Sequence, residues 1–167
     1  MLTLLLLACG APAEPEDKPS PEPTRGMPPM ELRTKWVDRT DAELDAELHA
    51  ACARAASRGV NLLVEFSAEW CIDCKSVSAM KPMIAEELYN WERVTVNVGR
   101  FDRHKALVKA FEVGGIAHWV ALAPSDCDQP VPAWPRLKSG LLEPASGAGG
   151  PKTPRDLRQW LEGARGS

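Results

Sequence analysis

Cys71 and Cys74 are the two side chains whose type and spacing best suit chemistry. They follow an apolar run at 61–67 that predicts a buried strand, and they open a helical pattern that begins at Ile72. A thiol at a helix N-terminus faces unpaired N–H groups and the positive end of the helix dipole, which stabilise its thiolate. Two intervening residues let the second thiol close a disulfide after the first has attacked a substrate. The pair therefore predicts thiol–disulfide exchange.

Two other roles for a Cys-x-x-Cys pair are weaker in this sequence. A tetrahedral zinc site would need a second such pair or two suitably spaced histidines, and the sequence has neither. A disulfide with a purely structural role would close so small a loop that it removes little entropy from the unfolded chain. Redox chemistry is therefore the favoured interpretation.

Four residues near the pair are candidates for tuning and docking. Glu65 stands in an otherwise apolar strand, so we expect it to be buried and to exchange a proton with Cys74. We expect Trp70 to shield the site and dock partners rather than fill the core. The charge of Asp73 beside the thiolates disfavours the reduced form and lowers the reduction potential, whereas Lys75 and the helix dipole act in the opposite direction. The balance predicts a reductase.

Strands and helices along residues 31–167 must position these side chains. A helix begins at the capping box Thr40-Asp41-Ala42-Glu43 and ends at Gly59, and Pro82 interrupts the helix predicted over 72–90. Further strands are predicted over 32–37, 93–98, 119–123 and 137–142, and further helices over 104–113 and from Thr153 onward. This order predicts an α/β sandwich in which helices flank a central mixed β-sheet, with a parallel βαβ unit first and an antiparallel hairpin later.

The stretch from Leu62 to Lys75, Leu-Leu-Val-Glu-Phe-Ser-Ala-Glu-Trp-Cys-Ile-Asp-Cys-Lys, resembles the active site of the thioredoxin superfamily. It is most similar to the C-terminal periplasmic domain of bacterial thiol:disulfide interchange proteins. The resemblance implies a thioredoxin-like domain over 31–167, with Cys71 as the exposed nucleophile, Cys74 as the buried resolving thiol and Glu65 as the acid beneath the disulfide. It implies protein thiols and disulfides as partners, a membrane or periplasmic electron donor, and no cofactor beyond the Cys71–Cys74 disulfide.

The sequence departs from that superfamily in the loop that faces the cysteines. Relatives carry a cis-proline in a Gly-Ile-Pro-Thr-like sequence, and the matching residues here are Gly115-Ile116-Ala117-His118. A cis bond before a residue other than proline costs about 2.5–4 kcal/mol, so we expect a trans Ile116–Ala117 bond and a reshaped loop. Ile116 and Ala117 are the candidates for docking the substrate.

Two further functions stay open. The loss of the proline brings His118 near Cys71 and Cys74, and these three side chains have the soft donor set that binds Cu(I). This set predicts a protein that handles copper or another metal. The other hypothesis keeps the fold without catalysis, as a binding module that uses its Trp-rich surface.

The N-terminal residues predict export and a lipid anchor. The apolar run Met1 to Cys9 is far shorter than the about 20 residues of a membrane-spanning helix, and Leu6-Leu7-Ala8-Cys9 resembles a bacterial lipobox. That resemblance implies a lipoprotein signal peptide over 1–8 and a lipidated Cys9 that holds the protein to the membrane of the cell envelope, facing the periplasm. Gly10 stands where an acidic residue is associated with inner-membrane retention, which favours the outer membrane. Residues 9–30 contain many of the prolines and are expected to form a disordered Pro/Glu-rich tether.

The overall charge argues against a nucleic-acid partner, and the other cysteines and histidines have expected structural roles. The 167 residues carry 20 Lys and Arg against 23 Asp and Glu, a net charge of -3 that lacks the basic footprint of a nucleic-acid partner. Cys52 lies on the apolar face of the first helix, which predicts a buried structural thiol, and Cys127 lies between two acids in a loop. A Cys52–Cys127 disulfide stays open, since the sequence gives no distance. His49 and His104 are expected to face solvent.

Overall fold

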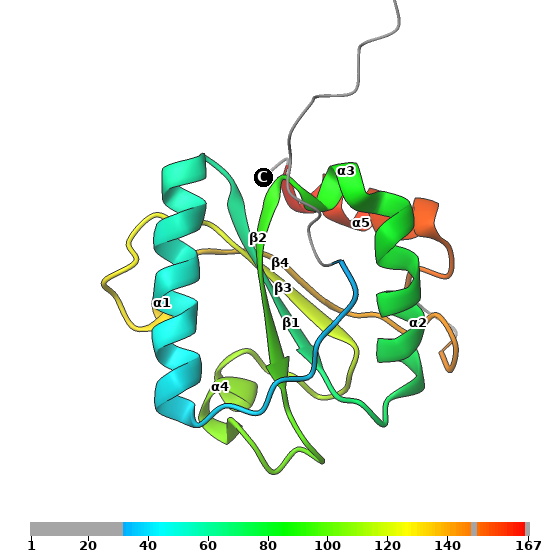
Figure 1. The fold of residues 1–167 in the computed structure, drawn as a ribbon, viewed down its shortest axis with the longest axis horizontal. Helices are drawn as coiled ribbons and strands as arrows, with labels where there is room; N and C mark the ends of the chain where they lie inside the picture. Colours follow the sequence, from blue (N-terminus) through cyan, green and yellow to red (C-terminus); the bar gives the residue numbers. More distant parts are fainter. Residues whose placement is uncertain (1–31, 148–149, 166–167) are drawn as a thin grey trace, which may run out of the picture. The chain divides into compact units, whose positions relative to one another are not determined.

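The computed structural model describes residues 32–147 and 150–165, and Figure 1 shows their fold. The signal peptide, Cys9 and the tether predicted over 1–30 lie outside these residues. The elements are α1 (Asp41–Arg58), β1 (Asn61–Ser67), α2 (Ile72–Met80), the 3₁₀ segment η1 (Lys81–Ile84), α3 (Ala85–Leu88), β2 (Trp91–Asn97), α4 (Lys105–Ala110), β3 (His118–Leu122), the 3₁₀ segment η2 (Val131–Ala133), β4 (Arg136–Leu141) and α5 (Pro154–Arg165). Within the described part of the chain, none of the helices is long and apolar enough to cross a membrane.

Four strands form one mixed sheet in the order β2-β1-β3-β4. β1 pairs with β2 in parallel and with β3 in antiparallel, and β3 pairs with β4 in antiparallel. Figure 1 places α1 on one side of the sheet and α2 on the other. The predicted α/β sandwich, with a parallel βαβ unit followed by an antiparallel hairpin, is therefore confirmed.

Local sequence signals explain the elements that frame the cysteines. The Thr40 hydroxyl accepts a hydrogen bond from the Glu43 amide at 3.2 Å and the Glu43 carboxylate accepts one from the Thr40 amide at 2.7 Å, so the predicted capping box is formed. Gly59 ends α1 in the left-handed conformation, with φ 64°. Six of the seven residues of β1 are buried, as expected of a central strand. Pro82 lies where α2 gives way to η1, because a proline cannot donate to the helical ladder.

The segment that precedes α1 differs from its prediction. Residues 32–37 are irregular and do not form the expected strand. Their polar groups bond to side chains instead, since the Thr34 amide donates to Ser78 Oγ at 2.9 Å and Trp36 Nε1 donates to Ser67 Oγ at 2.8 Å. These contacts fasten the segment to α2 and to the end of β1.

The second pair of cysteines forms a disulfide that joins α1 to the loop after β3. The Cα atoms of Cys52 and Cys127 are 5.6 Å apart, and the link spans 75 positions of sequence. Cys52 is buried as predicted, but it is bonded rather than a free thiol. His49 Nδ1 donates to the Cys127 carbonyl at 2.6 Å and its ring meets Trp134 edge-on, so this histidine is not merely solvated.

Candidate active site

Cys71 and Cys74 form a disulfide at the N-terminus of α2. Cys71 is the N-cap residue, and its Sγ accepts a hydrogen bond from the Cys74 amide at 3.1 Å. This is the donor environment that stabilises a thiolate at that sulfur. Cys71 is only 4% exposed and Cys74 2% exposed, so the expected contrast between an exposed and a buried cysteine is wrong for the oxidised form. The loop across the site covers Cys71, whose Sγ lies 3.4 Å from the Ile116 carbonyl oxygen.

That loop carries the clearest correction to the sequence-based expectations. The Ile116–Ala117 peptide bond is cis, not trans. Ala117 is buried and its carbonyl accepts a hydrogen bond from the Leu142 amide at 2.7 Å, while the Ile116 carbonyl faces Cys71. The trans expectation used only the local preference of alanine, whereas the two carbonyls beside this bond contact Cys71 and Leu142. Ile116 and Ala117 thus stand opposite the disulfide.

Glu65 is buried in β1 as predicted, and the structure gives it a partner that the sequence analysis did not identify. The Lys81 ammonium forms an ion pair with the Glu65 carboxylate and donates a further hydrogen bond to Thr34 Oγ1 at 2.7 Å. Arg93 Nη1 lies 3.7 Å from the same carboxylate. Burial lowers the pKa of Lys81, although the adjacent Glu65 carboxylate acts in the opposite direction. The signal for Lys81 was helical spacing, since it lies seven residues beyond Cys74 on the same inner face.

Asp73, between the two cysteines, is buried rather than exposed beside the sulfurs. Its carboxylate accepts hydrogen bonds from the Ala145 amide at 2.7 Å, the Ser146 amide at 3.1 Å and the Ser146 hydroxyl. Burial by itself would raise the pKa of Asp73, but these hydrogen bonds outweigh it and hold the pKa below 3.8. The carboxylate is thus ionised at neutral pH and bound to the loop after β4.

Exposed apolar side chains surround the disulfide. Trp70 is 49% exposed and its Nε1 donates to the Gly99 carbonyl at 2.7 Å, which confirms that it does not fill the core. Ile72 and Leu141 are also exposed, and Lys75 faces solvent on α2. Soluble domains expose few apolar patches without a binding role. The surroundings of the cysteines are therefore suited to receive a protein.

His118 does not join the cysteines in a metal site. Its Nε2 is hydrogen-bonded to Ser139 Oγ at 2.7 Å, on β4. Burial and the nearby positive charge of Arg136 lower its pKa below 6.5. Among the residues that the structure describes, no three His, Cys, Asp or Glu side chains are grouped so that they could hold a metal ion. The set of Cys71, Cys74 and His118 is therefore not assembled.

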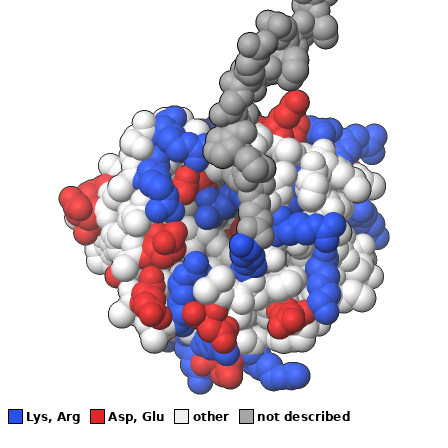
Figure 2. Space-filling model, in the orientation of Figure 1, with Lys and Arg blue, Asp and Glu red and all other residues white. Residues whose placement is uncertain are grey.

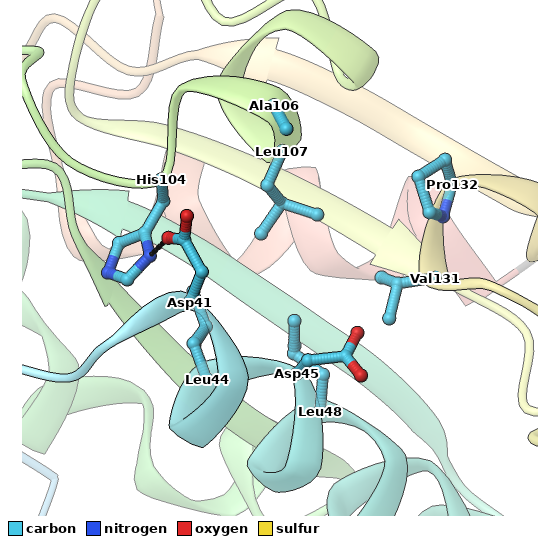
Figure 3. Close-up of a pocket in the computed structure, with 9 residues that line it drawn as sticks. All are labelled: Asp41, Leu44, Asp45, Leu48, His104, Ala106, Leu107, Val131 and Pro132. Carbon is cyan, nitrogen blue, oxygen red and sulfur yellow. Dashed lines mark hydrogen bonds and ion pairs between the residues drawn. The ribbon is translucent and has the colours of Figure 1, made fainter.

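A separate hollow of about 220 Å³ lies between α1, α4 and η2 and contains none of the cysteines (Figure 3). Leu44, Leu48 and Leu107 form much of its wall. His104 is buried beside it and donates to the Asp41 carboxylate at 2.7 Å, so the expectation of a solvated His104 is wrong. No motif in the sequence predicted this hollow.

On the face shown in Figure 2, basic and acidic side chains are interspersed.

Comparison with known proteins gives one family match and several similar solved structures. Residues 40–126 match the family model "Thioredoxin". A disulphide isomerase from Xylella fastidiosa Temecula1 superposes with a TM-score of 0.58 at 18% identity, over 77% of this chain and 95% of that one. A thioredoxin from Trypanosoma brucei brucei has a TM-score of 0.49 at 18% identity, over 82% of this chain and 95% of that one. Comparison with curated proteins gives no match.

The Xylella structure supports the fold, and the family model supports the assignment of the sequence. That model covers more than half of the chain, including β1, both cysteines of the pair and the loop opposite them. The expected resemblance to the thioredoxin superfamily is thereby confirmed. The protein belongs to the thioredoxin family and is a thiol–disulfide oxidoreductase with Cys71 and Cys74 as its redox pair.

Proposed function

We propose that the protein is a lipid-anchored reductase of protein disulfides in the bacterial cell envelope. One observation supports the chemical part of this proposal. Cys71 Sγ caps α2 and accepts a hydrogen bond from the Cys74 amide at 3.1 Å. A sulfur held there is stabilised as a thiolate, which is the form that attacks disulfides. The exposed Trp70 and Ile72 beside it supply apolar surface for a protein substrate.

The reaction takes two exchange steps. In the reduced protein the Cys71 thiolate attacks one sulfur of the substrate disulfide, which breaks that bond, forms a mixed disulfide and releases one substrate thiolate. Cys74 then loses its proton, and its thiolate attacks the Cys71 sulfur. This second step releases the other substrate thiolate and leaves the Cys71–Cys74 disulfide. The substrate gains two electrons, and a membrane or periplasmic donor must return them to the pair.

We assign to Glu65 the removal of the proton from Cys74. Its carboxylate is buried in β1, the strand that leads into the active-site turn, and a buried carboxylate is suited to exchange a proton with a buried thiol. The ion pair with Lys81 fixes its orientation. Lys75, exposed on the first turn of α2, tunes the site from the solvent side.

The direction of electron flow rests on Asp73. Its carboxylate stays ionised within the active-site turn, so it disfavours a second negative charge on the cysteines and stabilises their disulfide. A stable disulfide means a low reduction potential and a donor of electrons. We expect a potential near or below about -200 mV, whereas a value near the about -120 mV of strong oxidants would contradict the reductase assignment.

The anchor is tested separately from the chemistry. We expect fatty-acid labelling of the full chain in bacteria, recovery in the outer-membrane fraction and loss of both in Cys9→Ser. Unlabelled, freely soluble wild-type protein would contradict the anchor and would leave the redox assignment unaffected. Mixed-disulfide trapping with Cys74→Ala identifies the substrates, because the second exchange step cannot release them.

A further inference from the structure

Asp73 links the active-site turn to a segment that follows the sheet. Residues 142–147, which we name the 142–147 loop, leave β4 and pass beside the end of α2 that carries the disulfide (Figure 1, orange). The loop is held at two points. Its first residue, Leu142, donates its amide to the Ala117 carbonyl, and residues 145 and 146 donate three hydrogen bonds to Asp73.

These attachments connect the 142–147 loop both to the loop that covers Cys71 and to the first turn of α2. Ala117 belongs to the loop that covers Cys71, and Asp73 lies between the cysteines on α2. Leu141, just before the loop, is exposed and lies against Gly115, which precedes the cis peptide. The 142–147 loop therefore borders both the loop that covers Cys71 and the turn that carries Asp73.

We propose that Asp73 is a positioning residue that fixes the 142–147 loop as a docking wall for polypeptide substrates. This proposal rests on the proposed function and narrows its substrate class to disulfides within an extended chain. Such a chain continues past Cys71 on both sides of its own disulfide, so it also contacts the 142–147 loop. A small disulfide such as oxidised glutathione needs little beyond the sulfur of Cys71.

The carboxylate suits this role better than a purely electrostatic one. All three hydrogen bonds come from the loop, and a charge-assisted hydrogen bond is about twice as strong as a neutral one. Asp73 Oδ1 accepts both loop amides, and an Asp73→Asn side chain keeps an oxygen at that position, so it retains these hydrogen bonds in neutral, weaker form and loses the charge. Asp73→Ala removes both acceptor oxygens, so that variant should release Ala145 and Ser146 while leaving the cysteines in place.

Amide hydrogen exchange tests whether Asp73 fixes the 142–147 loop, and it needs no assay of activity. In the wild-type protein the Ala145 and Ser146 amides should be protected, and in Asp73→Ala they should exchange about tenfold faster, because protection reflects the free energy of local opening. Equal exchange rates in the two proteins would overturn the proposal.

Substrate selectivity tests whether the 142–147 loop docks polypeptides. The measurement is the ratio of kcat/KM for insulin to kcat/KM for oxidised glutathione. We expect it to fall about tenfold in Asp73→Ala, about threefold in Ser146→Ala, which keeps the Asp73 charge and loses one hydrogen bond, and less in Asp73→Asn than in Asp73→Ala. The matched control is Ser76→Ala, since the Ser76 hydroxyl donates only to the Ile72 carbonyl of its own helix. Its ratio should equal that of the wild type.

A ratio that falls as far in Asp73→Asn as in Asp73→Ala would show that Asp73 acts through its charge, and would overturn the docking wall. A wild-type protein that reduces neither disulfide would overturn the proposed function and, with it, the docking role. The exchange rates would still decide whether Asp73 fixes the loop.

Discussion

Lys81, at the start of η1, forms an ion pair with Glu65 of β1 in the interior of the protein. Both side chains are almost completely buried, at 1% and 2% exposure. Taking two charges out of water is costly, and the pair is tolerated only while each has its partner. The site therefore contains a buried acid that is paired with Lys81 and lies near Arg93.

Separating this pair should destabilise the protein strongly. We expect Lys81→Met to lower the free energy of unfolding by about 3–5 kcal/mol, because Glu65 would remain as a buried charge without its ammonium partner. Urea unfolding measures the loss. In the double variant Glu65→Gln/Lys81→Met most of the stability should return, since no unpaired charge is left. Losses that simply add in the double variant would show that the two side chains act independently.

The Cys52–Cys127 disulfide should contribute stability without contributing chemistry. A link across 75 positions restricts the unfolded chain by about 4 kcal/mol in the chain-entropy model. The double variant Cys52→Ala/Cys127→Ala should therefore unfold at lower urea concentration and still reduce insulin once folded. A change below about 1 kcal/mol would contradict this stabilising role.

His118 should make the stability depend on pH below neutrality. Burial, together with Arg136, lowers the pKa of His118 in the folded protein below its ordinary 6.5. The unfolded chain therefore takes up the proton first, so stability falls as the pH decreases from 6.5 through the folded pKa and is retained above 6.5. Urea unfolding of wild type and His118→Gln at several pH values measures the difference. Parallel pH profiles for the two proteins would contradict the prediction.

The sequence predicted the features that local rules determine. The capping box at Thr40, the end of α1 at Gly59 and the interruption at Pro82 depend on neighbouring residues, and all three are present. The spacing of Cys71 and Cys74 predicted that they act as a redox pair, because the two residues are close in the sequence. A carboxylate in an apolar strand was enough to predict the burial of Glu65.

Other features depend on residues far apart in the chain. The carbonyls of Ile116 and Ala117, on either side of the cis bond, contact Cys71 and Leu142. Helical patterns alone do not show that Lys81 turns toward Glu65. Asp73 was predicted to act on the thiolates by its charge, but its hydrogen bonds come from Ser146 and its neighbour, 73 and 72 positions away. A single sequence can place such residues on an inner face, but it does not specify which distant residue each one contacts.

The most direct measurement of the central claim is the turnover of insulin disulfides by purified wild type and Cys71→Ser, with dithiothreitol as the electron donor. We expect the wild type to accelerate reduction and Cys71→Ser to match the rate of the reductant alone, because a serine hydroxyl cannot form the mixed disulfide. Acceleration that persists in Cys71→Ser would contradict catalysis by this cysteine pair.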